Sequence, residues 1–218
     1  MLIDHIAKLY PSLWLNAIGR IAFPIFAFQL AEGFVLTHNK KNYFKRLFLA
    51  AIVSEIPFDL ANHHEPFYFK SQSVMLTFVL AFGIMFLIEK IISNPKSKNL
   101  ALYIIGIVFI LLLSVIINPD YNVFGVLLVV AFYICNKFNN KWARLIPIIL
   151  FVFTMPVTTT MPICGFAIKV HYFSILSAIP ILLYNGEKGI GGKKFQLFAY
   201  LFYPIHLFII YLLSICLF

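Results

Sequence analysis

Long apolar runs separated by short polar loops constrain this chain more than any other feature. The run from 100 to 117 contains no charged residue, and about 20 apolar residues suffice for a helix to span a bilayer. Strands of an outer-membrane barrel would alternate apolar and polar residues, and these runs do not alternate. With 62% hydrophobic and only 11% charged residues, the chain also lies outside the composition of soluble domains. The sequence therefore predicts a polytopic membrane protein.

The apolar runs give the predicted helices directly. Their expected boundaries, within a few residues, are 1–10, 13–37, 44–61, 72–91, 99–118, 121–136, 144–158, 162–184 and 195–217. The first run is short, because ten helical residues extend only about 15 Å. We expect either that Met1 lies within the membrane or that the natural chain starts upstream. The prediction is an all-α integral membrane protein with one polytopic domain, residues 1–218, of about eight to nine transmembrane helices, the first short or truncated.

Basic residues occur in every second loop. Four loops carry three or four of them each: 38–46, 89–98, 137–144 and 185–194. The loops between these carry Lys70 alone. The positive-inside rule assigns the basic loops to the cytoplasm, which places the C-terminus outside. The net charge of +9 is then explained by membrane topology, and we expect no nucleic-acid partner.

Ionisable side chains inside the predicted spans are concentrated in the first third of the chain. They are Asp4, His5, Arg20, Glu32, Glu55 and Asp59, and Lys169, His171 and His206 follow late in the chain. Such a residue costs at least about 2.5–3.5 kcal/mol at mid-membrane, so it is a functional candidate by default. The sequence thus predicts a polar site inside the bilayer.

Arg20 and Glu55 are expected at matching depth. At the helical rise, Arg20 lies about 12 Å, Glu55 about 10 Å and His5 about 9 Å from the same membrane face. Glu55 and Asp59 share a helix face, where two carboxylates need a cation or a shared proton. We therefore expect Arg20 to pair with Glu55 or Asp59, as a structural ion pair or as part of a catalytic centre with His5.

The loop at 38–46 is a second candidate site. Its basic residues are Lys40, Lys41, Lys45 and Arg46. Clustered Lys and Arg at the end of a span bind lipid head groups or another phosphate-bearing ligand. The three cysteines lack the spacing of metal ligands, and no metal site is predicted.

Five stretches of the chain, in order and covering nearly all of it, resemble the TraX family. They are IDHIAKLYP at 3–11, GRIAFPIFAFQLAEGF at 19–34, YFKRLFLAAIVSEIPFDLA at 43–61, NPDYNVFGVLLVVAFYI at 118–134 and FAYLFYPIHL at 198–207. The resemblance implies a multi-pass acetyltransferase of the bacterial cytoplasmic (inner) membrane, a family known for acetylating the N-terminal amine of pilin. It implies acetyl-CoA as the co-substrate and, as acceptor, the amine or hydroxyl of a peptide such as pilin or of a small or glycan molecule.

The resemblance also implies roles for individual residues. The family's DH pair falls on Asp4 and His5, its GR on Gly19 and Arg20, its AEG on Glu32, its SEIPFD run on Glu55 and Asp59, and its YPxH on Tyr203 and His206. Two positions depart from the family pattern, since little chain precedes the DH pair and Asn122 stands where a glycine often follows the DY pair.

These assignments give a specific chemical expectation. His5 is the predicted base, oriented by Asp59 or Glu55, and Arg20 either stabilises the site or completes its charge balance. Asp4, next to His5, is also a predicted catalytic residue. The predicted contacts to acetyl-CoA are Lys40, Lys41, Lys45, Arg46, Glu32, Tyr203 and His206, of which His206 is also a candidate second base. No metal is expected.

A secondary transporter is the alternative function. Asp4, Glu55, Asp59 and His206 would then form a proton or ion relay. Transporters of this kind are often built from repeats with paired broken helices, and the sequence shows no internal repeat. Composition and spacing alone leave the two functions open, and the resemblance favours the acetyltransferase.

Overall fold

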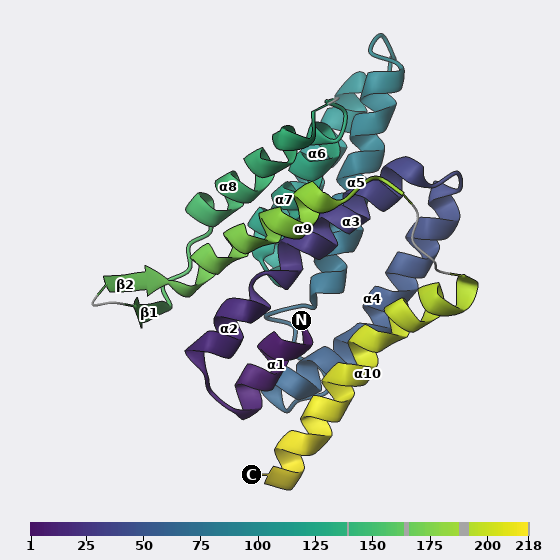
Figure 1. The fold of residues 1–218 in the computed structure, drawn as a ribbon. Coiled ribbons are helices and arrows are strands. Elements are labelled where there is room, and N and C mark those ends of the chain that lie inside the picture. Colours follow the sequence, from purple (N-terminus) through teal and green to yellow (C-terminus); the bar gives the residue numbers. More distant parts are fainter. Residues whose placement is uncertain (139, 164–165, 188–191, 218) are drawn as a thin grey trace.

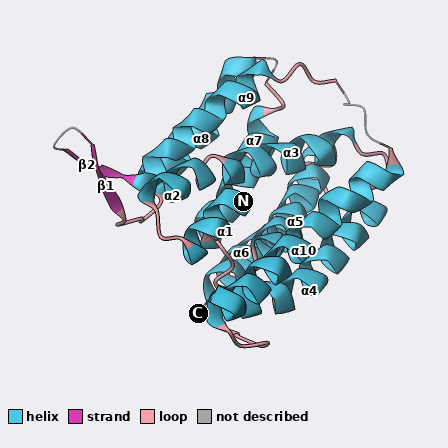
Figure 2. Ribbon diagram, turned by 60° about the horizontal axis from the view of Figure 1, so that its bottom comes forward, coloured by secondary structure: helices cyan, strands magenta, loops and turns pink. Residues whose placement is uncertain are grey.

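The apolar runs form a bundle of helices with one small hairpin at its side (Figures 1 and 2). The computed structural model describes residues 1–138, 140–163, 166–187 and 192–217. The helices are α1 (Leu2–Leu9), α2 (Leu13–Gly19), α3 (Ala22–Leu36), α4 (Lys40–His63), α5 (Val74–Ser93), α6 (Leu100–Ile117), α7 (Asn122–Cys135), η1 (Lys141–Arg144), α8 (Leu145–Thr154), η2 (Val170–Ser177), α9 (Ala178–Leu183) and α10 (Lys193–Leu217). The hairpin pairs β1 (Thr160–Ile163) with β2 (Phe166–Lys169), antiparallel.

The predicted class, an all-α membrane protein, is confirmed. Within the described residues, four helical segments are long and apolar enough to cross a membrane: Leu13–Leu36, Val74–Ser93, Leu100–Ile117 and Phe195–Leu217. The apolar segments Asn122–Cys135 and Val170–Leu183 are helical but shorter. The short first helix is also present, as the eight residues of α1.

Two predicted spans differ from the structure. The run 13–37 is divided at Arg20 into α2 and α3. The run 162–184 begins with the β1–β2 hairpin, and its helical part starts only at Val170. Three consecutive threonines, 158–160, lead into this hairpin, and the last of them begins β1; β-branched residues favour strands over helices. Pro162 disfavours a helix interior at this point as well.

Polar contacts gather several loops at one end of the bundle, which we call the basic end. Lys40 forms a salt bridge with Glu89, and Asn136 donates a hydrogen bond of 2.9 Å to Glu32. Arg144 donates to the carbonyl of Ile181. These contacts place the predicted basic loops of α3–α4, α5–α6 and α7–α8 together, as the charge alternation requires. Lys188, in the fourth basic loop, lies outside the described residues.

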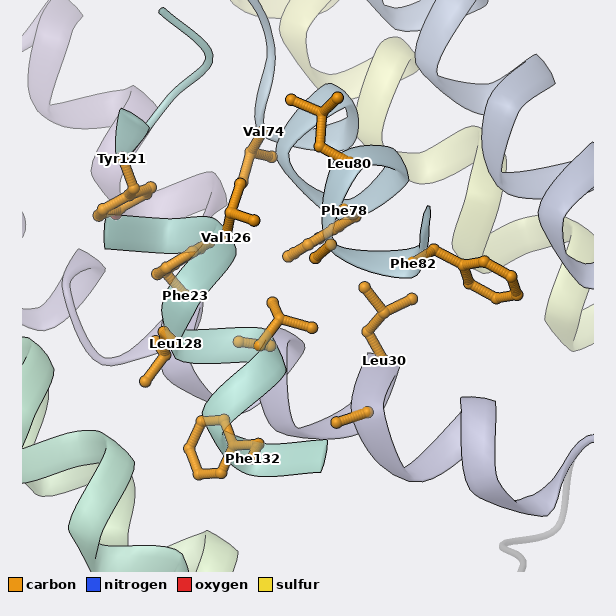
Figure 3. Packing of buried hydrophobic residues seen from close by; sticks show 14 of the residues in the cluster. Phe23, Leu30, Val74, Phe78, Leu80, Phe82, Tyr121, Val126, Leu128 and Phe132 are labelled. Atoms are coloured by element: carbon orange, nitrogen blue, oxygen red, sulfur yellow. The ribbon is translucent and has the colours of Figure 1, made fainter. Parts of the chain in front are cut away.

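The core lies where α3, α5 and α7 meet (Figure 3). The ring of Phe23 stacks on that of Tyr121 with centroids 3.8 Å apart, and parallel to that of Phe78 at 6.0 Å. Helix α6 packs outside this core, and only 6% of its most apolar window is buried. Lipid chains therefore have to cover most of α6.

Helix α1 packs closely against α2, and Gly19 permits this approach. A Cβ atom at position 19 would lie 2.8 Å from the Cα of Asp4 and 2.7 Å from its Oδ1, closer than atoms tolerate. Replacing Gly19 with alanine is therefore expected to displace Asp4 and destabilise the fold by about 1–3 kcal/mol, the usual cost of overpacking. A Cβ at Gly192 meets no atom within 4 Å, so Gly192→Ala is the matched control. Thermal unfolding in detergent checks both variants, and equal melting temperatures would contradict the packing argument.

Candidate active site

Helix α1 brings His5 against residues from the last helix. The imidazole rings of His5 and His206 lie 5.3 Å apart between centroids, and the ring of Tyr203 lies 6.5 Å from that of His5. All three side chains are buried. The structure therefore brings together two parts of the predicted site, one near each end of the chain. The depths estimated from the sequence did not predict this contact.

His206 has a defined tautomer. Its Nδ1 lies 2.7 Å from the carbonyl oxygen of Phe202, and because a carbonyl oxygen only accepts, Nδ1 carries the proton. The neutral ring then has a lone pair on Nε2. This Nε2 is buried, and no described residue hydrogen-bonds to it. His206 is thus arranged to accept a proton.

Arg20 contacts a residue that the sequence analysis did not select. Its Nη1 donates a hydrogen bond of 3.4 Å to the hydroxyl of Tyr121, and its guanidinium lies 5.9 Å from the centre of that ring. The Asp4 and Asp120 carboxylates also act on it electrostatically. The salt bridge found among the described residues joins Lys40 and Glu89. Within this part of the chain, Arg20 forms none with Glu55 or Asp59, so that predicted ion pair is wrong. The bend between α2 and α3 directs Arg20 toward α7.

Glu55 and Asp59 instead bind backbone at the α4–α5 connection. Glu55 accepts hydrogen bonds from the backbone N–H of Ser73, at 3.1 and 3.2 Å to its two oxygens, and from the Ser73 hydroxyl at 2.6 Å. Asp59 accepts one from the Tyr68 N–H at 2.9 Å. Because Ser73 is the N-cap of α5, Glu55 fastens α4 to the start of α5. These contacts are structural, and the role of either carboxylate in orienting His5 stays a prediction.

Tyr121 is held in an uncommon backbone conformation. Its φ is +64°, in the left-handed region that non-glycine residues rarely adopt. Thr77 fixes the turn by donating a 2.6 Å hydrogen bond to the Asp120 carbonyl, and stacking on Phe23 fixes the ring. Such conformations persist where surrounding structure determines them, often at functional sites. The sequence signal was the NPDYN stretch at 118–122.

The polar centre is the name we give to Asp4, His5, Arg20, Tyr121, Tyr203 and His206. Rings join His5, Tyr203 and His206, and electrostatic interactions join Asp4 to Arg20 and Tyr121 to Tyr203. Five helices, α1, α3, α5, α7 and α10, surround it with the α2–α3 bend. Glu55 and Asp59, which the sequence analysis expected at the same level, do not belong to this group.

A cavity of about 870 Å³ opens at the basic end. Its walls come from α3, the start of α4, α9 and the start of α10, and they include Glu32, His38, Arg46 and Tyr184. This volume is in the range of small-molecule sites. Of the predicted phosphate contacts, Arg46 lines the cavity, whereas Lys40, Lys41 and Lys45 do not. Lys40 is occupied by Glu89, and Lys41 and Lys45 are exposed.

A narrower chamber continues from this cavity toward the polar centre. It has a volume of about 260 Å³, and it shares Gln29, Tyr43, Gln196 and Tyr200 with the cavity. Its other walls are mainly apolar and include Phe202 and Tyr203, which precede His206 by about one helical turn. The Tyr203 hydroxyl is buried and interacts with the backbone of Val74, at the start of α5.

A third cavity lies at the end of the bundle opposite the basic end. It has a volume of about 390 Å³ and is lined largely by polar residues, among them Asn62, His63, Gln72, Asp120 and Tyr121. The backbone N–H of Asp120 donates a 2.8 Å hydrogen bond to the Gln72 carbonyl, which joins the two loops that form the cavity. Tyr121 thus lies between this cavity and Arg20.

Comparison with known proteins decides the family. The family model described as TraX protein matches residues 1–214. The chain belongs to the TraX family. It is also 26% identical, over 95% of this chain and 88% of the relative, to the probable fimbrial assembly protein FimC, serogroup H1, of Dichelobacter nodosus. No solved structure matches the chain.

Most of the five stretches that resemble the TraX family contribute residues to the polar centre. Asp4 and His5, Arg20, Tyr121, and Tyr203 with His206 come from four of these stretches and meet in the polar centre. The remaining stretch, 43–61, supplies Arg46 to the cavity and Glu55 to the start of α5. Segments far apart in sequence therefore form one connected region.

Proposed function

We propose that this protein is a membrane acetyltransferase that moves an acetyl group from acetyl-CoA to an acceptor amine or hydroxyl. The observation that carries the proposal is a pair of adjoining cavities that leads from the basic end to Tyr203, whose ring contacts those of His5 and His206. The cavity and the chamber share four lining residues, and Tyr203 lines the chamber.

The shape of these adjoining cavities suits acetyl-CoA. The wide cavity has room for the nucleotide part, and Arg46 is available for its phosphates, since guanidinium groups bind phosphate strongly. Glu32, a carboxylate, would not bind phosphate, but it can accept hydrogen bonds from N–H groups. The narrow chamber then fits the slender thioester arm. With the basic end at the cytoplasm, as the positive-inside rule predicts, acetyl-CoA would enter from the cytoplasm.

The residues beside the chamber match the chemistry of acyl transfer. The acceptor atom attacks the thioester carbonyl carbon, a C–N or C–O bond forms, and the C–S bond breaks. His206 Nε2 takes the proton that the acceptor loses and returns it to the departing thiolate. The Tyr203 hydroxyl donates to the carbonyl oxygen while that oxygen carries negative charge. His5, the base predicted from the sequence, lies beside His206 and is the second candidate for the proton transfer.

The acceptor would approach from the opposite end. The third cavity reaches Tyr121 and Asp120, and Arg20 connects Tyr121 to the polar centre. A peptide such as pilin is the acceptor class that we propose first, because the similar protein from Dichelobacter nodosus is named for fimbrial assembly. Small molecules and glycans with an amine or hydroxyl are the alternatives.

Calorimetric titration of acetyl-CoA into the detergent-purified protein tests the proposal. We expect saturable binding that CoA competes for, weakened by Arg46→Gln by about tenfold or more, as for loss of a hydrogen bond between charged groups. Lys41→Gln, an exposed lysine outside the cavity, is the matched control and should bind normally. The folded protein failing to bind acetyl-CoA would contradict the proposal and favour the transporter function.

A further inference from the structure

A groove on the outer surface of the bundle runs between α4 and α10, which lie side by side (Figure 1). It has a volume of about 410 Å³. Apolar side chains from both helices line it, and they are exposed: Leu49 at 60%, Val53 at 55%, Leu197 at 59% and Leu201 at 41%. The small Ala50 side chain also lines the groove, so the space is not filled by the protein itself.

One end of this groove is positively charged. Arg46 lies there, exposed, together with Gln196 and Tyr200. Arg46 interacts with the Tyr200 hydroxyl and lies 5.9 Å from the ring centre of Tyr43. No acidic residue is among the described residues that line the groove. From Arg46 to Val53 the helix extends about 10 Å. The groove therefore has a positive charge at one end and an apolar surface along the rest of its length.

We propose that the groove is a binding site for an anionic phospholipid, whose phosphate binds Arg46 and whose acyl chain lies along Leu49, Val53, Leu197 and Leu201. Charge complementarity selects this occupant, because a guanidinium with its planar donors binds phosphate closely and basic residues at the bilayer surface attract anionic lipids. Lipid binding at this site would not require the proposed reaction.

The groove also communicates with the large cavity. Arg46, Gln196 and Tyr200 line both, so one guanidinium faces a membrane groove and an internal cavity. A phosphate of a bound lipid and a phosphate of a ligand in the cavity would therefore compete for Arg46. The anionic lipid content of the membrane would then set how readily the cavity fills.

Native mass spectrometry of the purified protein without any CoA compound tests the lipid site alone. Phosphatidylglycerol and phosphatidylcholine with identical acyl chains serve as probes. We expect the protein to retain one phosphatidylglycerol in preference to phosphatidylcholine, and Arg46→Gln to reduce this retention by about tenfold or more, the loss expected for a charge-assisted hydrogen bond. Val53→Trp, at an exposed position in the groove, should reduce retention of both lipids by filling the space for the chain.

A control variant distinguishes binding in the groove from nonspecific attraction of anionic lipids to positive charge. Lys41→Gln removes an exposed positive charge of the same helix that does not line the groove, and it should leave the retention unchanged. Equal losses in Lys41→Gln and Arg46→Gln, or equal retention of the two lipids by the unaltered protein, would overturn the proposal. An unchanged retention in Val53→Trp would overturn the placement of the acyl chain.

Discussion

Replacing His206 with alanine is expected to lower kcat for acetyl transfer by about 10²–10⁴-fold, the usual contribution of a general base. The reason is the tautomer: Nδ1 donates to the Phe202 carbonyl, and the buried Nε2 is left with its lone pair on a ring that contacts Tyr203. Affinity for acetyl-CoA should change little, because His206 does not line the cavity. Initial rates of CoA release with a saturating amine acceptor give kcat, and calorimetry gives the affinity.

The control is His64→Ala, at an exposed position at the end of α4, which should retain full activity. His5→Ala is the informative comparison, since His5 lies 5.3 Å from His206 between ring centroids. If His5→Ala alone abolished turnover while His206→Ala retained it, the base would be His5, as the sequence analysis predicted. Full activity in both variants would exclude the histidine pair from the reaction.

The helical class was predictable because it depends on local composition. An apolar run long enough for the bilayer becomes a helix wherever it occurs, and the loop charges at 38–46 and 89–98 report sidedness. The hairpin before Val170 was missed because hydropathy does not distinguish an apolar strand from an apolar helix. The three threonines and Pro162 were the available signal.

The sequence gives the position of a residue along its helix, but it does not give the direction of the side chain around the helix axis. The rise per residue placed Arg20 and Glu55 at one level, and this led to the wrong ion pair. Arg20 follows a bend that turns it toward Tyr121, while Glu55 turns to the start of α5. No single-helix estimate contains these rotations, because they result from the packing of other helices.

The distribution of the basic residues illustrates the same limit. The sequence did not distinguish which of the four basic residues in 38–46 would contact a ligand. In the structure, Lys40 pairs with Glu89 and Arg46 alone of the four lines the cavity. The helical spacing of α4 decides this, because Arg46 lies on the side of α4 that meets α10.

Replacing Tyr203 with phenylalanine is expected to lower kcat by about 10²–10³-fold, the cost of losing one donor to a developing oxyanion. The variant removes only the hydroxyl, which is buried beside the chamber near the backbone of Val74. Its packing should be largely preserved, since the ring is unchanged and the hydroxyl's interaction with this backbone contributes only about 0.5–1.5 kcal/mol. Binding of acetyl-CoA should therefore persist while turnover falls.

A spectroscopic measurement distinguishes this role from a structural one. The infrared carbonyl stretch of acetyl-CoA labelled with ¹³C at the thioester carbonyl should shift to lower frequency on binding, because a hydrogen bond from Tyr203 weakens the C=O bond. We expect the shift to be smaller in Tyr203→Phe and unchanged in Tyr211→Phe, which removes a hydroxyl two turns further along α10. Identical shifts in all three proteins would exclude Tyr203 as the donor, whereas absent binding would instead count against the acetyltransferase itself. Because the stretch reports on the bound thioester before any transfer, it tests the donor even where the acceptor is still unidentified.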